Sequence, residues 1–166
     1  MKEKYFSLDD TNYLVKSAVV AALYAVLTVM LPVASYGPIQ FRFSEILVLL
    51  VFYNKRFIPG LVLGCAIANL FSPMMLFDVV FGTLSSYIAF MLMKKAKNIY
   101  VASIFPVLMV SVPAIGTWLI LASNEVFLVL LMQFMLSEFV MVPIIGVLLF
   151  KILEKNDGFM SYIYNF

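Results

Sequence analysis

A small set of polar side chains interrupts the apolar stretches of this sequence and is its main source of chemistry. Arg42 and Glu45 stand three residues apart in the stretch SYGPIQFRFSEILVLL, while Asp78 and Glu138 lie beside or within later apolar runs. An ionisable side chain at membrane depth costs several kcal/mol, so its presence there indicates a binding or transport site. Arg42 and Glu45 fit the lining or gate of a pocket, or alternatively a pair at positions i and i+3 of one helix.

Glu138 is the strongest candidate because it lies midway between Glu125 and Lys151, the charges that bound its apolar run. A regular helix over that run places the carboxyl near the middle of a bilayer. We predict that Glu138 binds a ligand. The alternative is a protonated carboxyl that bonds to a neighbouring helix.

Neutral polar and aromatic residues add further candidates. Asn69 offers donors and an acceptor, although such an amide also joins helices, and the same alternative holds for Gln133. Asp78 begins DVVFG, which is equally typical of a helix cap. Trp118 and the many Phe and Tyr residues are expected mostly in the core or the interface belt, but a few of them, with Trp118 or Phe71 as the candidates, are expected to stack on a planar ligand. The candidate substrate-binding residues are Glu138, Asn69, Asp78, Arg42, Glu45, Trp118, Phe71 and Gln133.

The sequence lacks the residue sets of an enzyme or a metalloprotein. Histidine is absent and Cys65 is the single cysteine, which removes the commonest general base and any metal-ligand pair. There is no nucleophile–base pair and no GxxxxGK[ST] phosphate loop. We therefore expect no catalytic residue, no metal and no cofactor, and ATP-driven activity would need a partner. A net charge of +2 is too small to indicate a nucleic-acid partner.

The composition predicts an all-α integral membrane protein with one membrane domain over residues 1–166. Hydrophobic residues make up 64% of the chain and the mean hydropathy is +1.07, far above the values of a soluble domain. The apolar runs are continuous rather than alternating, which favours helices over a β-barrel. A helix needs about 20 apolar residues to cross a bilayer. The expected spans are 14–34, 39–54, 57–76, 78–94, 98–122 and 126–152.

The second span is short, since residues 39–54 reach only about 24 Å as a helix. The distribution of Lys and Arg residues nevertheless favours a membrane crossing by this span. With six crossings, ten of the eleven Lys and Arg residues lie on one side and Arg42 alone lies opposite; without that crossing the best division is eight against three. The positive-inside rule therefore predicts six spans, a multi-pass location in the cell membrane and both termini in the cytoplasm.

Small residues mark the faces on which membrane helices pack closely. Gly60, Gly64 and Ala68 recur every four residues, and internal packing is the favoured interpretation. Alanines recur at the same spacing in the first span, where packing and a partner-facing surface fit equally well. These alanines are Ala18, Ala21, Ala22 and Ala25.

Three segments in this order, GPIQFRFSEILVLL, FIPGLVLGCAIANLFSP and DVVFGTLSSYIAF, resemble the QueT family. This family comprises substrate-binding S components of energy-coupling factor (ECF) transporters assigned to a queuosine precursor. The resemblance covers roughly residues 14–153 and is most specific from Gly37 to Phe90. It implies a six-helix S-component bundle, an ECF scaffold transmembrane subunit and two cytoplasmic ATPase subunits as partners. It also implies that the first-span alanines dock on the scaffold and that Arg42 and Glu45 lie next to the ligand.

For a 7-deazaguanine ligand, a carboxylate can accept the ring N–H and the exocyclic amine as a bidentate pair, and Glu138 is the expected acid. Asn69 is expected to read the ring carbonyl or pyrrole nitrogen, and Asp78 or Glu45 the amine of an aminomethyl ligand. The alternatives are an S component for another vitamin or nucleobase, a small intramembrane enzyme, or a structural assembly factor.

Overall fold

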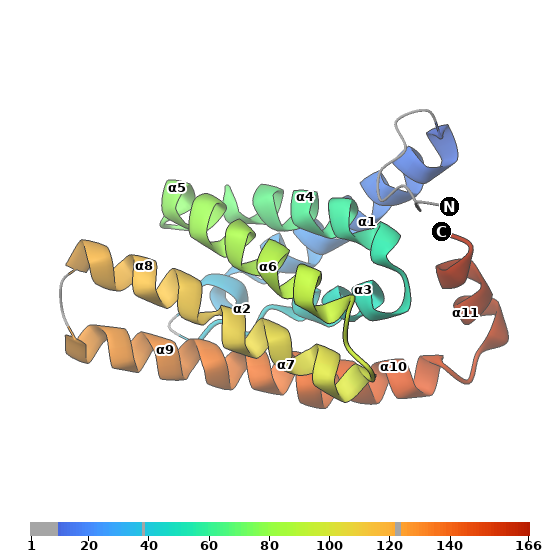
Figure 1. Ribbon diagram of the computed structural model, residues 1–166. Coiled ribbons are helices and arrows are strands. Elements are labelled where there is room, and N and C mark those ends of the chain that lie inside the picture. The colour runs from blue at the N-terminus through green and yellow to red at the C-terminus, as the bar shows by residue number, and fades with distance from the viewer. Residues whose placement is uncertain (1–9, 38, 122–123) are drawn as a thin grey trace.

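The computed structural model describes residues 10–37, 39–121 and 124–166, and all regular structure in these ranges is helical. The all-α fold class is therefore confirmed. Most helices lie side by side in an elongated bundle (Figure 1). The elements are α1 (Thr11–Val29), α2 (Pro32–Tyr36), η1 (Phe43–Leu49), α3 (Leu50–Tyr53), η2 (Lys55–Phe57), α4 (Ile58–Asn69), α5 (Met75–Phe77), η3 (Asp78–Gly82), α6 (Thr83–Met93), α7 (Ile99–Met109), α8 (Ser111–Leu121), α9 (Asn124–Phe139), η4 (Val140–Gly146), α10 (Val147–Leu153) and α11 (Asp157–Tyr164).

These elements join into longer helical segments that follow the order of the expected spans. Within the described ranges, four segments are long and apolar enough to cross a membrane. They are Thr11–Val29, Met75–Met93, Ile99–Gly116 and Phe127–Leu153. The segment Phe43–Tyr53 is shorter, and the 12 residues of α4 reach about 18 Å against a hydrocarbon core of about 30 Å. Helix length thus supports four crossings, and six crossings remain a prediction.

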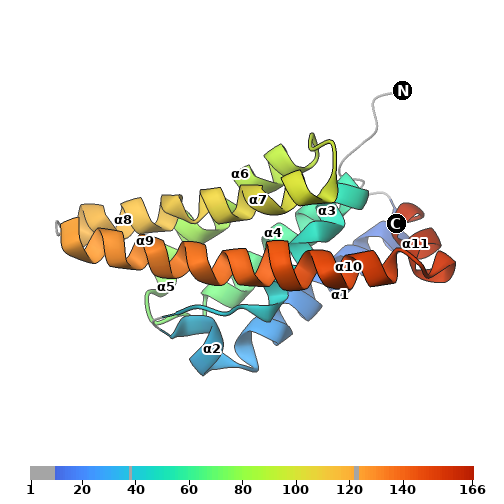
Figure 2. The ribbon, with the colours of Figure 1, turned by 90° about the horizontal axis from the view of Figure 1, so that it is seen from below.

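One end of the bundle gathers the start of α1, the α3–α4 and α6–α7 turns, the end of α10 and α11 (Figure 2). We call it the basic end. Hydrogen bonds hold these parts together: the Tyr13 hydroxyl donates to the carbonyl of Arg56 at 3.2 Å, and the Asn54 amide donates to the carbonyl of Ile163 at 2.9 Å. The Lys and Arg residues in these parts of the chain are Lys16, Lys55, Arg56, Lys94, Lys95, Lys97, Lys151 and Lys155.

Polar caps explain why several helices begin at the basic end. The side chains of Asp10, Asn54, Asn98 and Asn156 each accept a hydrogen bond from a backbone N–H two or three residues later. Such a cap stabilises a helix by about 1 kcal/mol. These short polar residues therefore fix the starts of α1, η2, α7 and α11.

The closest contact between helices joins α1 to α4 through glycine. A Cβ atom on Gly60 would lie 2.7 Å from the carbonyl oxygen of Ser17, and one on Gly64 would lie 2.8 Å from that of Ala21. Both distances are too short for a side chain, so only glycine permits this approach. The prediction that the glycine stripe serves internal packing is confirmed for these two residues.

The alanines of α1 divide between two environments. Ala21 and Ala25 are buried, with 2% and 8% of their surface exposed, whereas Ala18 and Ala22 are exposed. The four alanines therefore do not form one exposed surface, and docking on a partner stays a prediction. Ala21 and Ala25 pack inside the chain, and only Ala18 and Ala22 present surface to a partner or to lipid.

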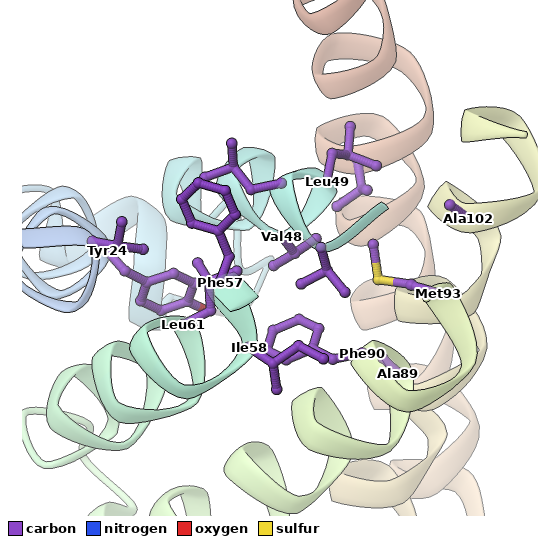
Figure 3. Close-up of a cluster of buried hydrophobic side chains, with 14 of the residues drawn as sticks. Tyr24, Val48, Leu49, Phe57, Ile58, Leu61, Ala89, Phe90, Met93 and Ala102 are labelled. Atoms are coloured by element: carbon purple, nitrogen blue, oxygen red, sulfur yellow. The ribbon is translucent and has the colours of Figure 1, made fainter. Parts of the chain in front are cut away.

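The buried apolar core lies between η1, α4, α6 and α7 and is joined by Tyr24 of α1 (Figure 3). Leu49, Leu61 and Met93 are fully buried there. Phe90, at 1% exposure, belongs to this core and also lines a polar cavity next to it. The core therefore forms one boundary of the candidate site.

Candidate functional site

A cavity of about 70 Å³, measured as the volume open to the centre of a water molecule, lies between residues 40–45, α4, η3, α6, α7, α8 and α9. This volume has room for more than one water. We call it the polar cavity. Its polar lining consists of Gln40, Arg42, Glu45, Asn69, Asp78, Ser85, Ser86, Ser137 and Glu138. Its remaining lining consists of Gly82, Ala89, Phe90, Pro106, Val110, Pro113 and Phe134.

Arg42 is held in the cavity wall by hydrogen bonds. Its Nη1 donates to Asn69 Oδ1 at 3.0 Å, and its Nε donates to the carbonyl of Ser35 at 3.2 Å. The guanidinium also lies over the ring of Tyr36, 5.5 Å from the ring centre. A guanidinium has five N–H donors, and these two protein hydrogen bonds leave others for a ligand.

Asn69 connects Arg42 to the segment that carries Asp78. Its Nδ2 donates to the backbone carbonyl of Asp78 at 2.9 Å. A Cβ atom on Gly82 would lie 2.9 Å from the same nitrogen, so glycine is needed for this close approach. The side chain of Asn69 is fully buried and engaged at both its oxygen and its nitrogen.

Hydroxyl groups hold two of the three acids that line the cavity. The hydroxyl of Tyr24, which is fully buried, donates to Glu45 Oε1. The hydroxyl of Ser72 donates to Asp78 Oδ2. These donors orient both carboxylates before any ligand arrives.

Glu138 differs from the other two acids. It is 8% exposed and lines the cavity, yet no described residue donates a hydrogen bond to its carboxylate or forms an ion pair with it. The hydroxyl of the adjacent Ser137 instead donates to the carbonyl of Phe134 in the same helix at 3.0 Å. A carboxylate without a partner in an apolar bundle is costly, which indicates a group that binds ligand.

Each cavity acid lies at or beside a departure from α-helical geometry. Glu45 lies in the 3₁₀ helix η1, Asp78 begins the π-helix η3, and Glu138 precedes the π-helix η4. Short 3₁₀ and π segments are frequent at functional sites, because they change the direction of side chains along a helix. These irregular turns help to bring the acids to one cavity.

The cavity therefore brings together five of the eight predicted substrate-binding residues: Glu138, Asn69, Asp78, Arg42 and Glu45. Phe71 is 61% exposed, and Trp118 is 38% exposed with its ring 6.4 Å from that of Phe127. These two aromatic residues and Gln133 do not line the cavity.

Several lining residues were not predicted from the sequence. Phe134 lies one helical turn before Glu138, and Gln40 lies beside Arg42, so spacing from the predicted residues offered a signal for both. Ser85, Ser86 and Phe90 offered none, because serine and phenylalanine are common throughout this apolar chain. In the described part of the chain, His, Cys, Asp and Glu do not form a group of three that could hold a metal ion.

Comparison with known proteins gives this cavity a context. Residues 14–155 match the family model described as QueT transporter. A curated relative, the queuosine precursor transporter QueT of Lactococcus lactis subsp. cremoris, is 44% identical over 82 residues. That segment spans 48% of this chain and 48% of the relative, so the match reaches about half the length of the relative. No solved structure matches the chain. Since the family match covers most of its length, the chain belongs to the QueT transporter family.

Proposed function

We propose that this chain is the substrate-binding subunit of an ECF-type importer and captures a queuosine precursor from outside the cell. The observation that carries the proposal is the polar cavity, in which the carboxylate of Glu138 has no hydrogen-bond or ion-pair partner among the described residues. Membership of the QueT transporter family and similarity to the Lactococcus queuosine precursor transporter support the ligand class.

The cavity chemistry suits a 7-deazaguanine. Glu138 accepts the ring N–H and the exocyclic amine as a bidentate pair, and Phe90 and Phe134 offer apolar surface to the planar ring. Because the amide of Asn69 is engaged by Arg42 and by the backbone of Asp78, we assign the contact with the ring carbonyl to Arg42. Asn69 then acts by positioning Arg42.

The charge of the cavity favours an amine-bearing ligand. Three acids and one arginine line it, and an uncompensated negative charge in an apolar environment is costly. The ammonium group of an aminomethyl precursor would offset part of this charge, and the side chain of Asp78 is the proposed partner. A nitrile precursor carries no such charge and should bind more weakly.

Calorimetry on the purified chain in detergent, without any partner, tests this function. An aminomethyl-7-deazaguanine should bind more tightly than the nitrile form, and thiamine and riboflavin should not bind. Tight binding of either vitamin would instead indicate an S component of different specificity. Chemical conversion of the ligand would indicate an enzyme, and absence of all binding would indicate a structural factor.

We further propose six crossings, with both termini in the cytoplasm. The gathering of eight Lys and Arg residues in the segments of the basic end supports this topology. Burial of the short segments Phe43–Tyr53 and α4 beside longer helices would let them cross where the bilayer is locally thin. Cysteine labelling should reach position 37 only from outside and position 96 only from inside, and the reverse pattern would contradict the topology.

The proposed partners are an ECF scaffold subunit and two ATPases, because the sequence contains no phosphate loop of its own. Ala18 and Ala22 are the α1 alanines available for docking. Ala22→Phe should leave the chain folded and weaken co-purification with the scaffold. Val101→Phe, an equally bulky change at an exposed position of α7, serves as the control. If both variants co-purify with the scaffold equally well, the α1 surface is not the docking site.

A further inference from the structure

A second cavity, of about 330 Å³, opens at the basic end between the α3–α4 turn, the α6–α7 turn and α11. We call it the lysine cavity. Lys55 and Lys94 both line it, although they come from different turns of the chain. No part of the proposed substrate site uses this cavity, because the two cavities share no lining residue.

Hydrogen bonds fix the walls of the lysine cavity. The Tyr53 hydroxyl donates to Glu154 Oε1 at 2.8 Å, and the Asn54 amide donates to the carbonyl of Ile163 at 2.9 Å. The second contact ties α11 to the α3–α4 turn and so holds Tyr164 at the rim. These bonds therefore tie together the segments that form the cavity.

The surroundings of the lysine cavity carry excess positive charge. Eight Lys and Arg residues lie in the segments of the basic end, together with three acids, Asp10, Glu154 and Asp157, among the described residues. Asp10 lies 3.5 Å from Arg56, and Glu154 lies 2.9 Å from Lys151. Glu154 also accepts the hydrogen bond from Tyr53 in the cavity wall, but the Lys and Arg residues of the basic end still outnumber its acids. A bound anion would be stabilised by this field.

The apolar part of the lining indicates a lipid rather than a soluble anion. Val51, which is buried, and Phe52 are the apolar aliphatic and phenyl side chains of this lining, and the cavity lies where the apolar helices α3 and α6 end. Basic pockets between membrane helices are typical sites for anionic lipid head groups, and tyrosines such as Tyr164, which is exposed here, are enriched at this depth. We propose that the lysine cavity binds the phosphate of an anionic phospholipid, with Lys55 and Lys94 as its cationic ligands.

Native mass spectrometry of the full chain, released from nanodiscs of mixed phosphatidylglycerol and phosphatidylcholine, tests the proposal. The wild-type chain should retain phosphatidylglycerol over phosphatidylcholine, and the double variant Lys55→Gln/Lys94→Gln should lose this preference by about tenfold or more. Lys95→Gln/Lys97→Gln removes the same charge from the same end, but outside the cavity lining, and should retain the preference. Thermal unfolding shows that each variant is folded, and Lys55→Arg/Lys94→Arg should bind lipid if the glutamine variant does not fold.

Two results would overturn the proposal. An equal loss in the matched control pair would mean that the basic end attracts anionic lipid diffusely, without a site. A soluble anion is the other possible source of the same chemistry, and millimolar inorganic phosphate added to pure phosphatidylcholine nanodiscs distinguishes it. Phosphate bound by the wild-type chain there, and lost in Lys55→Gln/Lys94→Gln, would assign the cavity to a free anion.

Discussion

The two walls of the polar cavity differ in how their polar groups are held. On the bonded wall, formed by residues 35–45, α4 and η3, hydrogen bonds join Arg42 to Asn69 and Asn69 to the backbone of Asp78. On the open wall, formed by α9, no described residue forms a hydrogen bond or ion pair with the carboxylate of Glu138. The polar groups of the bonded wall are held in place before a ligand binds, whereas the open wall has no described partner for its carboxylate, and a ligand can supply one.

The two walls should therefore contribute differently, the bonded wall mainly to the stability of the fold and the open wall mainly to ligand recognition. Groups that are already paired lose little entropy when a ligand binds, which favours affinity through preorganisation. A group without a partner gains most from the ligand, because its desolvation is offset only in the complex. Changes in the bonded wall should therefore lower the free energy of unfolding, and changes in the open wall should lower affinity alone.

The largest loss of stability is expected for Arg42→Met. This change removes the donor to Asn69 Oδ1 and to the carbonyl of Ser35, and it leaves three acids in the cavity without their cation. We expect the free energy of unfolding to fall by about 3 kcal/mol, measured by thermal unfolding in detergent. Lys97→Met, at an exposed site, is the control, and equal stability of the two variants would show that the bonded wall does not depend on Arg42.

Tyr24→Phe should have the next largest effect. It removes the hydroxyl that donates to Glu45 but keeps the buried ring in the core. The expected cost is about 2 kcal/mol, because a buried carboxylate loses its donor. Tyr162→Phe, at a 54% exposed position, should unfold at the wild-type temperature. A Tyr24→Phe variant as stable as wild type would mean that Glu45 is not held by this bond.

Gly82→Ala should have a smaller effect on stability. The added Cβ would lie 2.9 Å from Asn69 Nδ2, so the amide must move away from the carbonyl of Asp78 that it contacts. Overpacking should lower the free energy of unfolding by about 2 kcal/mol. The higher helix propensity of alanine should offset about 1 kcal/mol of this loss, which leaves a net loss of about 1 kcal/mol. Ligand affinity should also fall, since Asn69 positions Arg42. Unchanged affinity and unfolding temperature would show that this contact is loose.

Phe71→Leu should have the smallest effect. The side chain is 61% exposed and lies outside the cavity lining, so ligand affinity measured by calorimetry should change by less than about threefold. This expectation opposes the stacking role that its aromatic character suggested in the sequence. A loss of tenfold or more would mean that the ligand extends beyond the described cavity.

The helical fold and the main polar residues of the cavity could be predicted from the sequence for one physical reason. Charged and amide groups are rare in apolar segments because they are costly there. Their positions therefore marked Arg42, Glu45, Asn69, Asp78 and Glu138, and the structure places all five around one cavity.

The sequence was less able to predict which face of each helix points inward. In a membrane protein the side chains that face lipid are as apolar as those that face the core, so periodicity does not show how a helix is rotated. For this reason the sequence did not show that Trp118 and Phe71 lie outside the cavity lining, or that Ala21 and Ala25 are buried. The π-helices η3 and η4 also left no clear pattern, because they depend on tertiary packing rather than on local propensity.

The most direct test of the open wall is calorimetry on Glu138→Gln, with an amine-bearing 7-deazaguanine and an analogue that lacks the exocyclic amine. The wild-type chain should prefer the complete ligand by about a hundredfold or more, because the analogue leaves the carboxylate without a partner. Glu138→Gln should lose this preference and bind the complete ligand about a hundredfold more weakly, with no loss of unfolding temperature. Ser137→Ala, whose hydroxyl bonds within its own helix, should stay within about threefold of wild type. Wild-type affinity and discrimination in Glu138→Gln would contradict the assignment of Glu138 as the ligand-binding acid.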